Sequence, residues 1–414
     1  MESHHVQVLS LLLILCFTSS QTAPSSLILP ISKNFPSLQY TTNLSLGTPP
    51  NPITVTIDLA GPFLWLSYDQ TLSSSLTLHS AHCHSLLCSL AHFSQTKTLC
   101  NKNNSCILYP NNNTQGELTL DVLTLHASNG LKPTSIVNIP NFPFLYSSTK
   151  TLPIGLVGLG SSQFGLPKQL AGSFNFAPKF AICLPRESRE GYGVMFFGDE
   201  PYVFSPGIDV SKLLTYIPLV NIVRPKSRSN VTMFRKSYDY YVIIKSIWVN
   251  GKNKLHFNSS LLSIDKQGNG GTRFSTIHPY SIMESSIFNS LAKVFIEEGL
   301  ASNLTLVPPI EPFGVCFGTR EANGGIPIID LVFQDDYSVF WRIFATNSMV
   351  QMDNDIVCLG FIDGGVKATT SIVIGGLQLE DNLLQFDLAN SRLGFTSSLL
   401  LRQTDCSSFD FSSM

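Results

Sequence analysis

The sequence predicts an all-β protein built from two duplicated lobes. The chain has 414 residues, which exceeds the size at which a single hydrophobic core stops growing. Only 13% of the residues are charged and the mean hydropathy is +0.18, values typical of a large ordered protein. A strand, a turn, a polar loop and, later, two apolar residues followed by Gly occur in this order in each half. This repeat favours two similar lobes with a cleft between them.

Residues 1–21 are expected to form a secretory signal peptide. A short apolar core at residues 8–17 is followed by small and polar residues at 18–21, where cleavage would occur. About ten apolar residues are too few to span a bilayer, so a membrane anchor is not expected. The formal net charge is −2 and no run of Lys or Arg exists, so we expect neither nucleic acid nor a membrane surface as partner.

The cysteines and glycosylation motifs agree with secretion. Removal of Cys16 with the signal leaves eight cysteines, an even number that favours four disulfides. No Cys-x-x-Cys spacing is present, so neither a metal nor another cofactor is expected. The eight are Cys83, Cys88, Cys100, Cys106, Cys183, Cys316, Cys358 and Cys406. N-glycosylation motifs occur at Asn103, Asn112, Asn230, Asn258 and Asn303, and at Asn43, the weakest because it lies in an expected strand.

The N-terminal lobe is assigned to residues 22–205. Residues 40–46 and 53–58 alternate at period two around a turn at 47–50, so a hairpin delivers Asp58 at the end of a strand. Residues 67–114 are expected to form a long loop that disulfides hold in place. A short helix should begin near residues 166–170. Further strands are expected at residues 116–125, 180–184 and 194–198.

The C-terminal lobe is assigned to residues 206–414 and opens a second series of strands. The strongest helical pattern covers residues 280–298, where apolar residues fall on one side and Gly299 should stop the helix. An Asn250-Gly251 turn follows a strand. Strands are expected at residues 214–219, 240–244, 247–249, 328–333, 357–361, 384–388 and 392–395.

The polar loops of the two halves resemble the active-site loops of pepsin-like aspartic proteases. The first runs Asp58-Leu59-Ala60-Gly61, with residues 156–158 as its apolar-apolar-Gly strand; the second contains Ser275-Thr276-Ile277, with residues 373–375 in the same role. In that family each lobe supplies one Asp on an Asp-Thr-Gly-Ser/Thr loop. The resemblance therefore implies a bilobal pepsin-like fold with a few short helices.

The paired carboxylates of such enzymes share a proton, because two negative charges about 3 Å apart cannot both ionise cheaply. The hydroxyl of Ser275 cannot replace the second carboxylate in sharing this proton. Leu59, Ala60 and Gly61 also replace the Thr-Gly-Ser that orients the first Asp. Ile277 also replaces a flexible Gly. We therefore expect no catalytic residue and no protease activity, with Asp58 and Ser275 as degenerate positions of the former pair. An atypical protease using Asp58 alone remains an alternative, because a single carboxylate can act as a general base.

Nearly the whole mature chain resembles the plant pepsin-fold inhibitors. That family comprises xylanase inhibitors, xyloglucan-endoglucanase inhibitors, extracellular dermal glycoproteins and legume basic globulins. The motifs that carry the resemblance are residues 270–280, 312–314, 347–350, 371–383, 386–388 and 392–395. The resemblance implies the disulfides Cys316–Cys358 and Cys183–Cys406, while pairing among the other four cysteines stays open. Relatives usually carry twelve mature cysteines, and Ser67 and Tyr146 stand where relatives have Cys.

An inhibitor of a glycoside hydrolase must engage two carboxylates that flank the scissile bond, for which a guanidinium is well suited. Relatives use basic residues on second-lobe loops, and the nearest matches here are Arg402 and Arg320, the latter beside Glu321. Ordinary surface arginines are an equal alternative. His82, His84 and His278 are interpreted as structural or surface residues, since no carboxylate accompanies the first two.

The resemblance thus implies a secreted, monomeric inhibitor of microbial cell-wall-degrading glycoside hydrolases, either xylanases or xyloglucan-specific endoglucanases. Its expected location is the apoplast or cell wall. An alternative function of a different class is that of an extracellular storage or binding glycoprotein, which recognises a peptide or a cell-wall carbohydrate.

Overall fold

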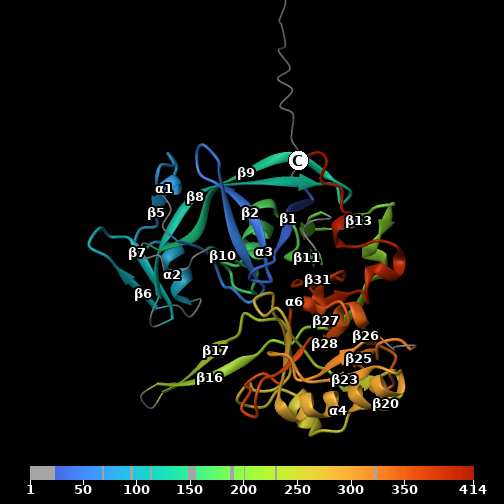
Figure 1. Cartoon of the computed structure of the whole chain (residues 1–414). Helices are drawn as coiled ribbons and strands as arrows, with labels where there is room; N and C mark the ends of the chain where they lie inside the picture. Colours follow the sequence, from blue (N-terminus) through green and yellow to red (C-terminus); the bar gives the residue numbers. More distant parts are fainter. Residues whose placement is uncertain are drawn as a thin grey trace, which may run out of the picture.

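The computed structural model describes residues 24–67, 70–93, 97–111, 114–147, 155–186, 191–199, 201–228, 231–320 and 324–414. The expected signal peptide, residues 1–21, and the motifs at Asn112 and Asn230 lie outside these ranges, as does Glu321. Strands predominate over short helices in the described residues, which confirms the all-β class. Figure 1 shows the first half of the chain, in blue to green, above the second half, in yellow and orange. No helix in the described residues is long and apolar enough to cross a bilayer.

The largest sheet has fifteen strands and joins the two halves of the chain. Its C-terminal strands pair with the first half because β31 lies antiparallel to β11, with Ile182 opposite Leu384. In hydrogen-bonded order the strands are β15 (Thr215–Pro218), β32 (Arg392–Phe395), β31 (Leu383–Asp387), β11 (Lys179–Cys183), β12 (Gly193–Gly198), β1 (Ser26–Asn34), β2 (Gln39–Leu46), β3 (Asn51–Asp58), β10 (Gly155–Gly158), β4 (Leu64–Ser67), β9 (Pro133–Ser147), β8 (Thr114–Ser128), β7 (Cys106–Asn111) and β6 (Lys97–Cys100), with β5 (His79–Ser80) paired to β8.

Aromatic side chains fill the junction between the halves. The rings of Phe180 and Phe386 stack with their centroids 4.8 Å apart, and Tyr240 lies 4.6 Å from Phe386. Such pairs contribute beyond the apolar area that they bury. Because Phe180 belongs to β11 and Phe386 to β31, the two halves share one core at this point.

Among the described residues, three smaller sheets and one hairpin belong to the second half, and a further hairpin spans the expected lobe boundary. One sheet runs β18 (Tyr241–Val242), β21 (Thr272–Phe274), β30 (Ile372–Ile374), β22 (Ser281–Met283) and β29 (Phe361–Asp363). Another sheet runs β20 (Asn253–Lys254), β19 (Ser246–Val249), β25 (Ile329–Val332) and β26 (Phe340–Ile343). The third sheet runs β23 (Thr305–Val307), β24 (Cys316–Gly318), β28 (Ile356–Leu359) and β27 (Met349–Asp353). The hairpins are β13 (Val203–Phe204) with β14 (Ile208–Asp209), whose turn contains the expected lobe boundary at 205/206, and β16 (Val223–Arg228) with β17 (Val231–Lys236).

The repeat seen in the sequence is present as a three-strand unit in each half. In the first half β10 lies parallel to β3 and antiparallel to β4. In the second half β30 lies parallel to β21 and antiparallel to β22. Each unit thus places its polar loop between the outer strands and the apolar-apolar-Gly strand in the middle.

The helices correct two expectations. The long helix α4 covers Ser285–Ala301, not residues 280–298: Ser281–Met283 instead form β22 between β29 and β30, and Gly299 lies inside the helix. The segment 67–114 is not a plain loop, since its described residues include two helices and three strands. The other α-helices are α1 (Gln70–Ser73), α2 (Leu86–Phe93), α3 (Leu166–Phe174), α5 (Ala345–Ser348) and α6 (Gly376–Leu379), and short 3₁₀ turns cover Val210–Leu213, Ser259–Leu262, Leu399–Arg402 and Cys406–Ser408.

Four disulfides join the eight cysteines of the described residues. Cys183–Cys406 and Cys316–Cys358 are the two pairs that the family resemblance implies. The pairs that the sequence left open are Cys83–Cys100 and Cys88–Cys106. The parallel pairing of β4 with β9 places Ser67 opposite Ser147, next to Tyr146, so the two positions where relatives have Cys are neighbours.

Candidate functional site

Asp58 lies at the end of β3, where its side chain is half-buried. Its Oδ1 accepts a hydrogen bond of 2.9 Å from the backbone N–H of Ala60. Burial raises the pKa of Asp58, because it disfavours the charged form, while the backbone N–H groups of Ala60 and Gly61 act in the opposite direction. The first half therefore keeps one carboxyl group with a raised pKa.

The apolar-apolar-Gly strand supports this loop because its Gly permits a close approach. A Cβ atom on Gly158 would lie 2.3 Å from the carbonyl oxygen of Gly61, a distance that no side chain tolerates. In the second half a Cβ on Gly375 would lie 2.2 Å from the carbonyl carbon of Tyr280. The glycines of the repeated motif are thus explained by backbone packing against the polar loops.

Ser275 occupies the corresponding place in the second half, and its hydroxyl is occupied by its own loop. Its Oγ accepts hydrogen bonds from the backbone N–H groups of Ile277, at 3.2 Å, and His278, at 3.3 Å. The neighbouring Thr276 reaches the first loop: its Oγ1 donates to the carbonyl oxygen of Ile57 at 2.5 Å and accepts from the N–H of Leu59 at 3.2 Å. The two polar loops therefore face each other with Asp58 on one side and a hydroxyl on the other.

A second acid, Asp239, lies near this pair, and no motif in the sequence marks it. Its charge contributes to raising the pKa of Asp58, whereas the charge of Arg273 lowers it. The Oδ1 of Asp239 is ion-paired with Nη1 of Arg273 at 3.3 Å, and its Oδ2 accepts a hydrogen bond from Ser237. No hydrogen bond joins Asp239 to Asp58, both of which the structure describes.

Arg273 is the cation of the site. Burial and then the charge of Arg273 lower the pKa of His278, which disfavours a second positive charge there. Arg273 stands two residues before Ser275 in the loop that the sequence singles out, and that proximity was the signal available for it. The site thus combines one half-buried acid with one guanidinium that is bound to a second acid.

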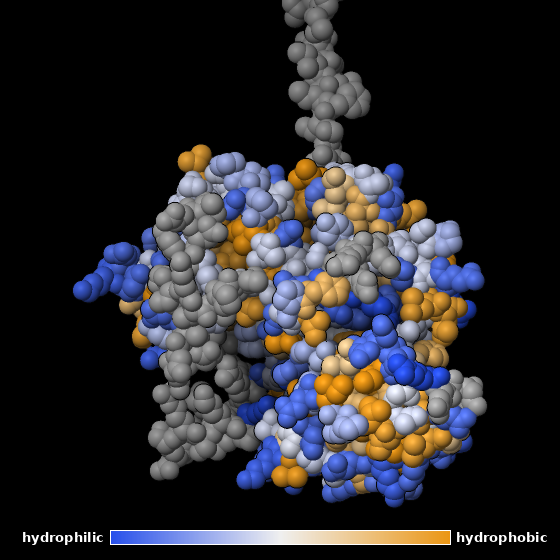
Figure 2. All heavy atoms as spheres, in the orientation of Figure 1, coloured by the Kyte–Doolittle hydropathy of each residue, from blue (hydrophilic) through white to orange (hydrophobic). Residues whose placement is uncertain are grey.

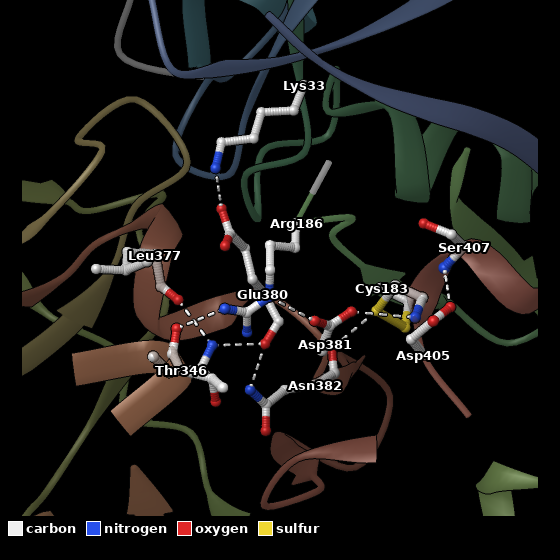
Figure 3. Close-up of polar contacts among 12 residues, drawn as sticks. Lys33, Cys183, Arg186, Thr346, Leu377, Glu380, Asp381, Asn382, Asp405 and Ser407 are labelled. Atoms are coloured by element: carbon white, nitrogen blue, oxygen red, sulfur yellow. Dashed lines mark hydrogen bonds and ion pairs between the residues drawn. A yellow bond between two sulfur atoms is a disulfide. The ribbon is translucent and has the colours of Figure 1, made fainter. Parts of the chain in front are cut away.

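Beside this site, a polar joint holds the two halves together (Figure 3). Nζ of Lys33 and Oη of Tyr40 both donate to Oε1 of Glu380, each at 2.6 Å. Burial raises the pKa of Glu380, and the charge of Lys33 partly offsets this effect. Arg186 donates to Asp381 at 3.2 Å and to the carbonyl oxygen of Thr346 at 2.8 Å, close to the Cys183–Cys406 disulfide.

The two candidate inhibitor arginines lie in different settings. Nε of Arg320 is 2.8 Å from Oδ2 of Asp355, so its charge already has a partner. Arg402 ends a 3₁₀ turn and is exposed, with no ion pair to any residue that the structure describes. It lines a groove of about 440 Å³ together with Leu401, which is 63% exposed.

The other candidate groups have ordinary structural settings. Cys83, His84 and Cys100 lie close enough together to suggest metal ligands, but the two cysteines form a disulfide, which leaves no thiolate for a metal. The glycosylation motifs at Asn43, Asn103, Asn258 and Asn303 are all exposed. Figure 2 shows apolar and polar residues interspersed over the face in view.

Comparison with known proteins gives one family match for each half of the chain, and each match contains one of the two polar loops. The family described as "Xylanase inhibitor N-terminal" matches residues 40–199, and the family described as "Xylanase inhibitor C-terminal" matches residues 239–397. The chain belongs to the xylanase-inhibitor family. The matches cover Asp58 in the first part and Ser275 in the second.

Proteins that resemble this chain carry different names. "Probable aspartic proteinase GIP2" of Nicotiana benthamiana is 43% identical over 99% of this chain and 98% of its own. "Gamma conglutin 1" of Prunus dulcis is 37% identical over 95% of this chain and 92% of its own. The solved structure described as "Crystal structure of edgp" superimposes with a TM-score of 0.87 at 40% identity, over 94% of this chain and 99% of that one.

Proposed function

We propose that this chain is a secreted, non-proteolytic inhibitor of microbial cell-wall-degrading glycoside hydrolases, either xylanases or xyloglucan-specific endoglucanases. The observation that carries the proposal is Ser275 at the position of the second carboxyl, in a pair of loops that otherwise still face each other. Peptide hydrolysis in this fold needs two carboxyls that share a proton. A scaffold that keeps the loops and lacks the second carboxyl is suited to binding.

The groove beside Arg402 supports a specific way of binding. Leu401 offers exposed apolar surface, and the guanidinium of Arg402 is free to meet a carboxylate. Glycoside hydrolases present two carboxylates about their scissile bond, and an arginine pairs with a carboxylate through two parallel hydrogen bonds. We infer that this loop enters the active-site cleft of the hydrolase.

Secretion belongs to the same proposal. The apolar stretch at residues 8–17 and the four disulfides support an extracellular protein, because disulfides persist in oxidising compartments. The exposed glycosylation motifs fit that location, which for a plant relative would be the apoplast or cell wall.

The decisive experiment incubates the purified mature protein with a panel of xylanases and xyloglucan-specific endoglucanases. We expect loss of activity of at least one enzyme and a stable complex on size-exclusion chromatography. No inhibition and no complex with any member would overturn the proposal. Proteolysis at acid pH that disappears in Asp58→Ala would instead favour the protease, the activity named for the relative from Nicotiana benthamiana.

A storage or binding glycoprotein is the second candidate, favoured by the 37% identity to a gamma conglutin over 95% of the chain. Binding to a cell-wall carbohydrate or a peptide, without inhibition of any hydrolase in the panel, would support it. A glycan array and a peptide library, probed with the same preparation, make this comparison.

A further inference from the structure

A small cavity lies at the seam between the two halves, apart from the groove at Arg402. Its volume is about 120 Å³, and its lining includes Ser161 and Lys168 from the first half and Lys236, Asp239 and Tyr240 from the second. The backbone N–H of Ser161 donates to the carbonyl oxygen of Tyr238 at 3.0 Å. Oη of Tyr240 donates to the carbonyl oxygen of Leu159 at 2.6 Å. These bonds fix the two walls of the cavity relative to each other.

The lining carries an excess of positive charge. Lys168 is half-buried at the first turn of α3, and Lys236 ends β17; neither forms an ion pair with any described residue. The carboxylate in the lining, Asp239, is already bound to Arg273. Two lysines therefore line a cavity without forming an ion pair to any described residue.

The two lysines also act on each other. Burial, and then the charge of Lys236, lower the pKa of Lys168. Like charges held together by a fold repel one another, and an anion between them would relieve that repulsion. The hydroxyl of Ser161 and the amide of Asn221 lie in the same lining and can donate hydrogen bonds to anionic oxygens.

The dimensions restrict the ligand. Pockets that hold drug-sized molecules measure about 300–1,000 Å³, so this cavity is suited to a group of a few heavy atoms. Sulfate, phosphate and the carboxylate of a sugar acid share the required chemistry: a compact anion whose oxygens accept several charge-assisted hydrogen bonds.

We propose that the seam between the halves holds a binding site for a small oxyanion, clamped by Lys168 and Lys236. This inference is independent of the proposed inhibition, because the cavity and the groove at Arg402 share no lining residue. An anion held between residues of both halves would stabilise their arrangement, since any ligand that binds only the folded state adds to stability.

The test is titration calorimetry of the full mature protein with sodium sulfate, sodium phosphate and sodium galacturonate, against sodium chloride at equal ionic strength. We expect saturable 1:1 binding of at least one of the three, weakened about tenfold in Lys168→Gln and in Lys236→Gln. Lys236→Arg, which keeps the charge, and Lys293→Gln, an exposed control on α4, should bind as the parent does. The preferred anion then distinguishes an inorganic source from a sugar acid.

Thermal unfolding supplies a second measurement. If the two lysines had only a structural role, the effect of the anion on Tm would not differ between the variants. Without the anion, Lys236→Gln should be as stable as the parent or more so, because one of the two repelling charges is gone. With the anion, the increase in Tm should be smaller in this variant than in the parent and unchanged in Lys293→Gln. Binding of none of the three anions, or equal binding and equal Tm shifts in all variants, would overturn the proposal. Lys236 is exposed, so its variants should fold even if Lys168→Gln does not.

Discussion

The hydroxyl of Thr276 donates a hydrogen bond of 2.5 Å to the carbonyl oxygen of Ile57, across the seam between the two polar loops. The same hydroxyl accepts the backbone N–H of Leu59 at 3.2 Å. The reciprocal contact from the first loop is impossible, because the position that would supply it holds Leu59, whose buried side chain has no hydroxyl. One threonine therefore forms the side-chain link between the two loops.

Thr276→Val should destabilise the protein by about 2–6 kcal/mol, because two buried backbone groups lose their partner at about 1–3 kcal/mol each. The measurement is denaturant unfolding. Thr276→Ser, which keeps the hydroxyl, should retain most of the stability, and Thr305→Val on the exposed surface of β23 should change it little. A loss in Thr276→Ser as large as that in Thr276→Val would show that the hydroxyl is not the dominant contribution of this side chain.

Asp58→Asn should change how stability depends on pH. The pKa of Asp58 is raised in the folded state, so its contribution to stability is complete at low pH and is lost as pH rises through the folded pKa. Asn keeps an oxygen to accept the N–H of Ala60 and never ionises. We expect the variant to gain stability over the parent near pH 7 and to match it near pH 3. A pH-independent difference between the two Tm profiles would contradict this assignment.

The sequence pattern predicted the fold well in segments whose conformation depends mainly on residues close by in the chain. The hairpin that delivers Asp58 and the Gly of each middle strand follow from period-two alternation and from steric need. The start of α4 was missed because residues 281–283 carry an apolar pattern that suits a helix, yet they pair with β29 and β30. Such pairing depends on partners far away in the chain and overrides local propensity.

The candidate site was predictable only where a motif existed. Asp58 and Ser275 stand in loops with a recognisable pattern, whereas Asp239 is a single acid between aromatic residues, and its relation to Arg273 exists only after folding. The groove beside Arg402 depends in the same way on residues from a distant segment, Leu213 and Thr215. Charge relationships of this kind have no signature in a single sequence.

Lys33→Met should cost about 3–5 kcal/mol at neutral pH, because it leaves the buried carboxylate of Glu380 without its cation. Lys33 holds down the pKa of Glu380, which burial already raises. Without Lys33 that pKa rises further, so the loss should grow as pH rises and be smaller near pH 4. Thermal unfolding at both pH values checks this. The double variant Lys33→Met/Glu380→Gln should recover part of the loss, and no recovery would argue against an electrostatic cause.

The disulfides should differ in their contribution according to the length of chain that they close. Cys183–Cys406 spans 223 residues and Cys83–Cys100 spans 17. In the chain-entropy account, removing the former should cost about 2 kcal/mol more than removing the latter. Paired Cys→Ala variants, compared by denaturant unfolding, measure the difference. Equal losses would mean that strain or residual structure in the unfolded chain outweighs loop entropy.

The two candidate arginines allow a matched test of how a hydrolase would be bound. If Arg402 meets a catalytic carboxylate, Arg402→Gln should weaken inhibition about thirtyfold or more, as expected of a central interface residue. Arg320→Gln should weaken it less than about fivefold, because an exposed arginine already paired with Asp355 contributes little. Inhibition constants for both variants against the same enzyme give the comparison. A larger effect at Arg320 would place the contact on the loop between β24 and β25, and unchanged inhibition in both variants would exclude these two arginines as the groups that bind the hydrolase.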